Sequence, residues 1–180
     1  MADDAIIPAR LTAATVCSYI DFDGHAATGQ TPSLQAQLQS EGVAGLWALL
    51  SRQEHAYLGD EVGMGKTRQA MGVIATQFLH KPDSRVVVVC PSRTVQVQWQ
   101  SEWAQFLRSC YRLLDDRLLA TADASQIEDL HLHERLSDLY EALRIGEGRI
   151  HLLRYSSFSI PLSLDGSTPE GRLADYAVIV

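Results

Sequence analysis

Residues 59–67 combine the residue types that are needed to bind a phosphate group. They read, in order, Gly59, Asp60, Glu61, Val62, Gly63, Met64, Gly65, Lys66 and Thr67. Glycine permits backbone conformations that are closed to other residues, and it lets backbone amides approach an anion closely. Such amides bind anions at a helix N-terminus, where a Lys can reach the β- and γ-phosphates and a Thr hydroxyl can ligate Mg²⁺. The stretch therefore predicts a phosphate-binding P-loop.

The generic P-loop pattern, G-x-x-x-x-G-K-[ST], is not fully met, because Asp60 stands where its first glycine belongs. A chance Gly-Lys-Thr on a surface turn is the alternative. The flanking sequence favours the P-loop, because residues 55–59 predict a short buried strand and residues 66–79 predict a helix with one apolar face. Lys66 is also one of only two lysines in the chain, and it occupies the position that phosphate binding requires.

Strands and helices alternate along the rest of the chain. The pattern predicts helices over residues 31–51, 94–107 and 125–144, and strands over residues 85–90, 149–154 and 175–180. Four consecutive valines within residues 85–90 are typical of a parallel strand buried on both faces. The alternation predicts a three-layer α/β/α fold with a mostly parallel sheet and right-handed crossovers.

Residues 60–67 resemble motif I of the Swi/Snf-type ATPases of helicase superfamily two, which reads Asp-Glu-Met/Val-Gly-Leu-Gly-Lys-Thr. Asp60, which breaks the generic pattern, is what this family has at that position. Three further segments are similar to family motifs and follow in the right order. They are residues 39–43 (Gln-Ser-Glu-Gly-Val, the adenine-reading Gln), residues 89–106 (motif Ia and its helix) and residues 153–156 (motif Ib). The resemblance covers residues 34–180.

The resemblance implies a RecA-like P-loop ATPase lobe that couples ATP hydrolysis to movement along duplex DNA. It assigns ATP binding to Gln39 and to each residue from Asp60 to Thr67, with Lys66 and Thr67 as the catalytic residues and Thr67 as a Mg²⁺ ligand. It places Pro91, Ser92, Arg93 and Ser156 beside the nucleic-acid backbone. Loops at the carboxyl ends of parallel strands converge on one face, where small hydroxyl side chains and backbone amides can bind phosphates without reading bases.

Residues 175–180 resemble the strand that leads directly into motif II, Asp-Glu-x-His, whose carboxylates would complete the Mg²⁺ site. The sequence ends one residue before that motif, so we expect a fragment that is incomplete at the C-terminus, with a second RecA-like lobe beyond it. Residues 1–30 are a weakly patterned lead-in, and the resemblance implies that residues 31–180 are a partial helicase ATP-binding domain. We expect this chain to bind nucleotide weakly and to be deficient in hydrolysis.

The composition of the chain argues against several other classes of protein. The chain has 15 basic and 22 acidic residues, and this net charge of −7 argues against a simple polyanion binder. Residues 59–110 are an exception, because they carry six basic and four acidic residues. Three cysteines without a C-x-x-C pair argue against a disulfide scaffold and favour a reducing compartment. The apolar runs are too short to span a bilayer, so we expect a cytoplasmic protein without a membrane partner.

The sequence is also compatible with two other functions. The chain could be a degenerate or non-catalytic P-loop module that binds a nucleotide or a partner, or a P-loop phosphotransferase of another family. Stimulation of ATP hydrolysis by duplex DNA favours the translocase, whereas stimulation by a small acceptor favours the phosphotransferase. A metal site at His131 and His133 is not expected, because residues two apart on the helix predicted there point in different directions.

Overall fold

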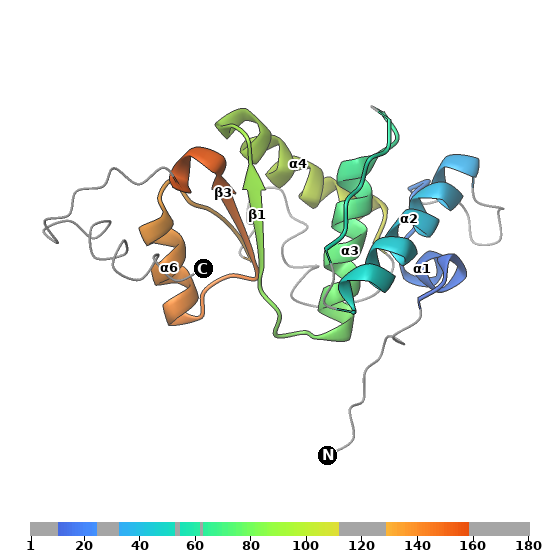
Figure 1. The fold of residues 1–180 in the computed structure, drawn as a ribbon, viewed down its shortest axis with the longest axis horizontal. Coiled ribbons are helices and arrows are strands. Elements are labelled where there is room, and N and C mark those ends of the chain that lie inside the picture. The colour runs from blue at the N-terminus through green and yellow to red at the C-terminus, as the bar shows by residue number, and fades with distance from the viewer. Residues whose placement is uncertain (1–10, 25–32, 53–54, 62, 112–128, 159–180) are drawn as a thin grey trace, which may run out of the picture.

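The computed structural model describes residues 11–24, 33–52, 55–61, 63–111 and 129–158. Its elements, in chain order, are α1 (Ala13–Tyr19), α2 (Leu34–Leu50), α3 (Lys66–His80), β1 (Val86–Cys90), α4 (Arg93–Ser109), β2 (Leu130–Leu132), α6 (Leu136–Ile145), β3 (Ile150–Arg154) and η1 (Tyr155–Phe158) (Figure 1). The predicted α/β fold is confirmed. None of the helices in the described residues is both long enough and apolar enough to cross a membrane.

The three strands form a parallel sheet in the order β1-β3-β2. Ile150 in the central strand pairs with Val86 on one side and with Leu130 on the other. Parallel neighbours need crossover connections, and α6 supplies the connection between β2 and β3. In Figure 1, α6 and α3 lie on opposite sides of the strands, and the predicted three-layer arrangement is therefore confirmed.

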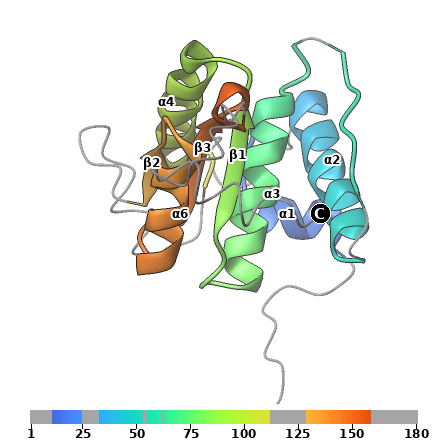
Figure 2. The same ribbon diagram turned by 60° about the vertical axis from the view of Figure 1, so that its left-hand side comes forward.

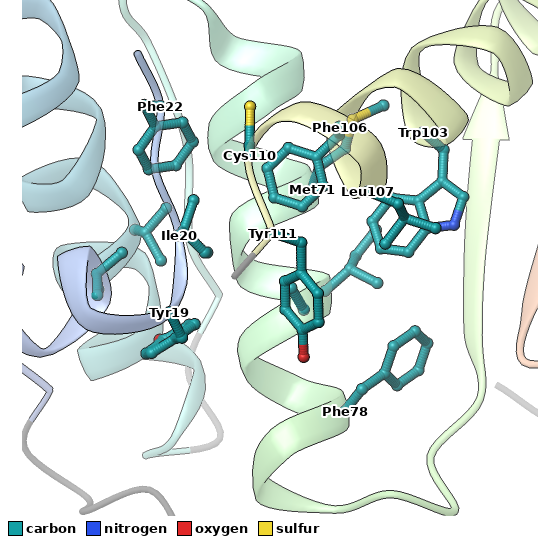
Figure 3. Packing of buried hydrophobic residues seen from close by; sticks show 14 of the residues in the cluster. Tyr19, Ile20, Phe22, Met71, Phe78, Trp103, Phe106, Leu107, Cys110 and Tyr111 are labelled. Atoms are coloured by element: carbon teal, nitrogen blue, oxygen red, sulfur yellow. The ribbon is translucent and has the colours of Figure 1, made fainter. Parts of the chain in front are cut away.

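The main hydrophobic core lies between the sheet and the helices α1 to α4. Figure 3 shows its side chains, which include Tyr19, Ile20, Phe22, Met71, Phe78, Trp103, Phe106, Leu107, Cys110 and Tyr111. The rings of Trp103 and Phe106 stack with their centroids 5.6 Å apart. The sheet contributes Ile150 and Leu152 of β3, which face the same side because they alternate along the strand, and Leu130 of β2. This core fixes α3 and α4 against one face of the sheet.

Most of the predicted helices and strands are confirmed. Residues 31–51 contain α2, which begins after Ser33, whose hydroxyl accepts a hydrogen bond from the Ala36 amide at 3.1 Å. The predicted helices over residues 66–79 and 94–107 correspond to α3 and α4. The predicted strands over residues 85–90 and 149–154 correspond to β1 and β3. The predicted strand over residues 175–180 lies outside the described residues.

The single helix predicted over residues 125–144 is wrong. Residues 130–132 form β2, and the helix α6 begins only at Leu136. Leu130 is buried in the main core, and the strand is held by its pairing with β3, which the helical spacing of leucines does not reveal. The Arg135 amide donates to the Asp138 carboxylate at 3.1 Å, which marks the true start of the helix.

The predicted strand over residues 55–59 is also wrong, because these residues have no sheet partner in the described part of the chain. Tyr57 is 91% exposed. Among the strands of the described residues, β1 lies at one edge of the sheet. The prediction that β1 is buried on both faces is wrong. Val87 and Val89 are 42% and 47% exposed, because α6 contacts the central strand β3 on that side of the sheet.

Candidate nucleotide-binding site

The glycine-rich loop ends directly at the N-terminus of α3. Gly65 is the N-cap residue and adopts the left-handed conformation with φ +77°, and Gly63 has φ +92°. Only glycine adopts this region without strain. The N-cap position provides no side-chain hydrogen bond, so the first amides of α3 have no side-chain cap. Uncapped amides and the positive end of the helix dipole together favour an anion at this position.

Gln39 supports the loop from behind. Its side chain is 3% exposed, and its Nε2 donates to the Met64 carbonyl at 3.3 Å. A Cβ atom at Gly65 would overlap the Gln39 amide, so the close approach of α2 to the loop requires glycine there. The structure therefore brings Gln39 to the P-loop, as the resemblance implies, but Gln39 is not among the residues that line the adjacent pocket.

Lys66 folds over the loop that precedes it. Its Nζ donates to the carbonyl oxygens of Asp60, at 2.7 Å, and Glu61, at 2.9 Å. These contacts hold the ammonium group among backbone oxygens, where it neutralises their partial charges. Thr67, the next residue, is half-buried in the first turn of α3. Val62 also belongs to the predicted site, but it lies outside the described residues.

A pocket of about 580 Å³ opens beside the loop. It is lined by Gly63, Gly65, Lys66, Thr67, Arg68, Gln98, Glu102, Gln105, Phe106 and Ser109. Its volume lies in the range typical of small-molecule sites. The first four residues belong to the predicted site, and the structure brings them together. The pocket has a loop side rich in backbone donors and a second side formed by α4.

The α4 side of the pocket is polar and was not predicted. Gln98, Glu102, Gln105 and Ser109 recur at intervals of three and four residues, so they share one face of the helix. Gln98 Nε2 donates to Glu102 Oε1 at 2.6 Å, which orients the carboxylate. The polar stripe could have been found from the sequence by its spacing, but its position opposite the P-loop depends on how α3 and α4 pack.

Gln69 is a second residue that sequence reasoning missed. Its side chain is 2% exposed, and its Nε2 donates to the Asp60 carboxylate at 2.8 Å. It lies one turn after Lys66 on α3, so it joins the two ends of the loop. Asp60, the residue that departs from the generic P-loop pattern, is thereby held against α3.

The residues expected at a nucleic-acid backbone lie at the carboxyl ends of two neighbouring strands. Pro91, Ser92 and Arg93 follow β1, and Ser156 lies in η1, which follows β3 (Figure 2). All four are exposed. The Ser92 hydroxyl already accepts a hydrogen bond from the Val95 amide at 3.3 Å, as the N-cap of α4. Arg93 is not free, since its Nη1 lies 2.6 Å from Glu134 Oε1.

His131 and His133 do not lie on a helix, so the premise of the sequence argument about them is wrong. His131 lies in β2 opposite His151 of β3, and His133 follows the last residue of β2. Both rings lie near the His151 ring. His133 Nε2 and His151 Nδ1 are 3.0 Å apart. Burial lowers the pKa of His133 and lowers that of His151 to about 4. Even so, no three metal-ligating side chains among the described residues are placed to hold a metal ion.

Comparisons with known proteins identify a family and several partial relatives. The family described as "Type III restriction enzyme, res subunit" matches residues 32–172 of this chain. The match covers the P-loop, the α4 side of the pocket and the exposed carboxyl ends of β1 and β3. No solved structure matches the chain.

Several curated proteins are similar over a shorter segment. The rice "SNF2 domain-containing protein ENL1" is 39% identical over 36% of this chain, and "Protein CHROMATIN REMODELING 24" of Arabidopsis thaliana is 38% identical over 37%. The "RNA polymerase-associated protein RapA" of Pectobacterium atrosepticum is 41% identical over 39%. The matched segment spans 6% or 7% of the length of these relatives. The expected likeness to Swi/Snf-type proteins is thus confirmed.

Proposed function

This chain belongs to the helicase-type family described as the res subunit of type III restriction enzymes, and from that membership we propose that it is the ATP-binding lobe of a DNA translocase. One observation carries the proposal. Gly63, Gly65, Lys66 and Thr67 line a single pocket at the uncapped N-terminus of α3. The Swi/Snf-type relatives support an ATPase of the helicase type rather than a phosphotransferase.

The residues present fit a magnesium nucleotide. The amides of residues 63–67 and the dipole of α3 would hold the β- and γ-phosphates. Lys66 would exchange its two carbonyl partners, at Asp60 and Glu61, for phosphate oxygens, because an ammonium group binds the more negative oxygen more strongly. The Thr67 hydroxyl would ligate Mg²⁺, which prefers oxygen donors and neutralises the charge of the phosphates.

Gln39 and Gln69 would position the glycine-rich loop. Gln39 donates to the Met64 carbonyl, and Gln69 donates to the Asp60 carboxylate, so both amides are committed to the loop itself. We propose that Gln39 reads the adenine when the loop closes around ATP and the Met64 carbonyl moves. Gln69 would keep Asp60 in place during that change.

We propose that this chain binds ATP without turning it over. Hydrolysis needs a carboxylate that completes the Mg²⁺ site and a group that positions the attacking water. Among the described residues, Glu102 is the carboxylate that lines the pocket, and its Oε1 is held by Gln98. We expect the missing carboxylates and a second RecA-like lobe to come from outside the described residues.

The same proposal assigns duplex DNA to the carboxyl edge of the sheet. Pro91, Ser92, Arg93 and Ser156 are exposed there, on segments that follow adjacent parallel strands. Hydroxyl groups and backbone amides at such an edge bind phosphates regardless of base sequence, as a translocase requires. The second lobe would supply the other side of the DNA cleft. We also propose that the protein is cytoplasmic.

Replacement of Lys66 tests the nucleotide site. We expect Lys66→Ala to weaken binding of a fluorescent ATP analogue with Mg²⁺ by about tenfold or more, because charge-assisted hydrogen bonds to phosphate are lost. Lys81→Ala is the matched control, since it removes the only other lysine, which is exposed just after α3. Equal binding by Lys66→Ala and the unmodified protein would contradict the proposal.

A turnover assay separates the alternatives on the same proteins. We expect no more than one ATP hydrolysed per chain, with or without duplex DNA. Multiple turnovers that disappear in Lys66→Ala would contradict the proposed lack of hydrolysis and leave ATP binding intact. Turnover stimulated by a small acceptor, but not by duplex DNA, would indicate a phosphotransferase.

A further inference from the structure

An acidic residue occupies the middle of the edge that we assign to DNA. Glu134 lies between β2 and α6, and its Oε1 is 2.6 Å from Nη1 of Arg93, 41 residues earlier in the chain. Arg93 is the first residue of α4, directly after β1. Because the strand order is β1-β3-β2, this pair bridges the segment that follows the central strand β3.

The backbone of Glu134 is fixed at this position by its neighbours. Its carbonyl accepts a hydrogen bond from the Ser157 hydroxyl at 2.8 Å and a longer one from Arg154 Nη2 at 3.4 Å. Both donors belong to β3 and η1, the elements that end at the same edge. The continuous segment β3–η1 therefore holds the backbone of Glu134, while its carboxylate pairs with Arg93 on α4.

We propose that the Glu134 carboxylate occupies the place of a DNA phosphate at Arg93 and that the phosphate must displace it for the edge to bind. A carboxylate and a phosphate both present oxygen acceptors to a guanidinium group, so they compete for the same donors. Glu134 thereby sets the affinity of the edge for the nucleic-acid backbone. This inference rests on the proposed DNA-binding function.

The exposure of the pair makes displacement feasible. The side chains of Arg93 and Glu134 are 64% and 66% exposed, so the ion pair is solvated on both sides and screened by salt. A DNA phosphate belongs to a dense array of negative charge, and its binding also releases counterions. The duplex can therefore outcompete Glu134 at low salt and loses this advantage as the salt concentration rises.

Removing the charge of Glu134 tests the inference. We expect Glu134→Gln to bind a fluorescein-labelled duplex about three- to fivefold more tightly at low salt, the change that a solvated ion pair can supply. The measurement is fluorescence anisotropy over a salt series, with circular dichroism to check folding. The gain should vanish in the Arg93→Gln background, because Glu134 then has no guanidinium to mask.

Glu141→Gln is the matched control. Glu141 lies on α6, away from the edge, and makes a similar exposed pair with Arg144 at 2.7 Å. It should leave the affinity unchanged. An equal gain from Glu141→Gln, or a gain from Glu134→Gln that survives in the Arg93→Gln background, would overturn the inference and leave DNA binding itself standing. Absence of duplex binding by every variant, Glu134→Gln included, would overturn both the inference and the proposed DNA function.

Discussion

Gly65 illustrates how one backbone conformation shapes the candidate nucleotide site. Its left-handed φ of +77° turns the chain into α3, and the absence of a Cβ lets Gln39 approach the loop. The uncapped N-terminus of α3 and Lys66 line the same pocket, while the Lys66 ammonium group is bound to the carbonyl oxygens of Asp60 and Glu61. The phosphate binding that we propose here therefore depends on the backbone of two glycines as much as on the charged side chain.

Alanine at position 65 should disrupt this arrangement. We expect Gly65→Ala to lower the free energy of unfolding by at least about 1–2 kcal/mol, from the left-handed conformation alone. It should also weaken binding of the ATP analogue, because the overlap with Gln39 displaces the loop. Urea denaturation and the fluorescence assay measure the two effects.

Gly45→Ala is the matched control for that substitution. Gly45 lies within α2 and is exposed, and a Cβ there would meet no atom within 4 Å. It should leave nucleotide binding unchanged and raise stability by roughly 0.5–1 kcal/mol, the usual gain of alanine over glycine in a helix. If Gly65→Ala is as benign as Gly45→Ala, the loop conformation described above is wrong.

At the scale of elements, the pairing of β2 with β3 creates a cluster of three histidines on one face of the sheet. The centroids of the His131, His133 and His151 rings are 5.2–6.3 Å apart. His151 is fully buried, and its Nε2 has no hydrogen-bond partner. The pKa of His151 is lowered to about 4, first by burial and then by the nearby His133, His131 and Arg85. The His151 imidazole is therefore neutral at neutral pH.

This cluster predicts a loss of stability in mild acid. Between pH 6.5, the ordinary pKa, and about pH 4, the unfolded state binds a proton at His151 that the folded state excludes. The free energy of unfolding should therefore fall as the pH decreases through this range, by about 3 kcal/mol from His151. His133, whose pKa is also lowered by burial, adds to the same trend. Urea denaturation over a pH series measures the slope.

Two variants test whether His151 causes the dependence of stability on pH. His151→Leu should reduce the dependence on pH, whereas His55→Gln, at an exposed position, should leave it unchanged. Titration of the His151 ring proton signals by NMR in the unmodified protein gives an independent value. A midpoint near 6.5 would show that the folded state does not exclude the proton.

At the scale of the whole molecule, the main core joins α1 to the helices and strands that carry the candidate site. Tyr19 is 2% exposed, and its hydroxyl lies 2.7 Å from Thr76 Oγ1 on α3. Val16, Ile20 and Phe22 belong to the same cluster. Residues 11–24 thus pack as part of the fold, although the domain boundary that we place at residue 31 remains a prediction.

Removal of the Tyr19 hydroxyl measures this connection. We expect Tyr19→Phe to lower the free energy of unfolding by about 1 kcal/mol, the usual net value of one hydrogen bond. The loss is not larger because Thr76 Oγ1 keeps its bond to the Gly72 carbonyl at 2.8 Å. Tyr57→Phe is the control, since Tyr57 is 91% exposed and should be neutral. Equal effects in urea denaturation would mean that α1 does not dock on α3 as described.

The sequence by itself located the P-loop, the helices α2, α3 and α4, and the strands β1 and β3. These features depend on local physics, because a glycine sets its own backbone freedom and an amphipathic helix of 15 or 17 residues repeats its pattern over several turns. Short segments were missed or misassigned. β2 has three residues, too few for a pattern of its own, and residues 55–59 have a strand-like composition but pair with no strand in the part of the chain that the structure describes.

Tertiary structure alone decided which distant side chains share a site. The polar face of α4 lines the candidate nucleotide pocket because α4 packs beside α3, and Glu134 contacts Arg93 because β2 and β1 flank β3. The three histidines came together for the same reason. Such contacts join residues tens of positions apart, and they form only when buried apolar surface fixes the elements against one another.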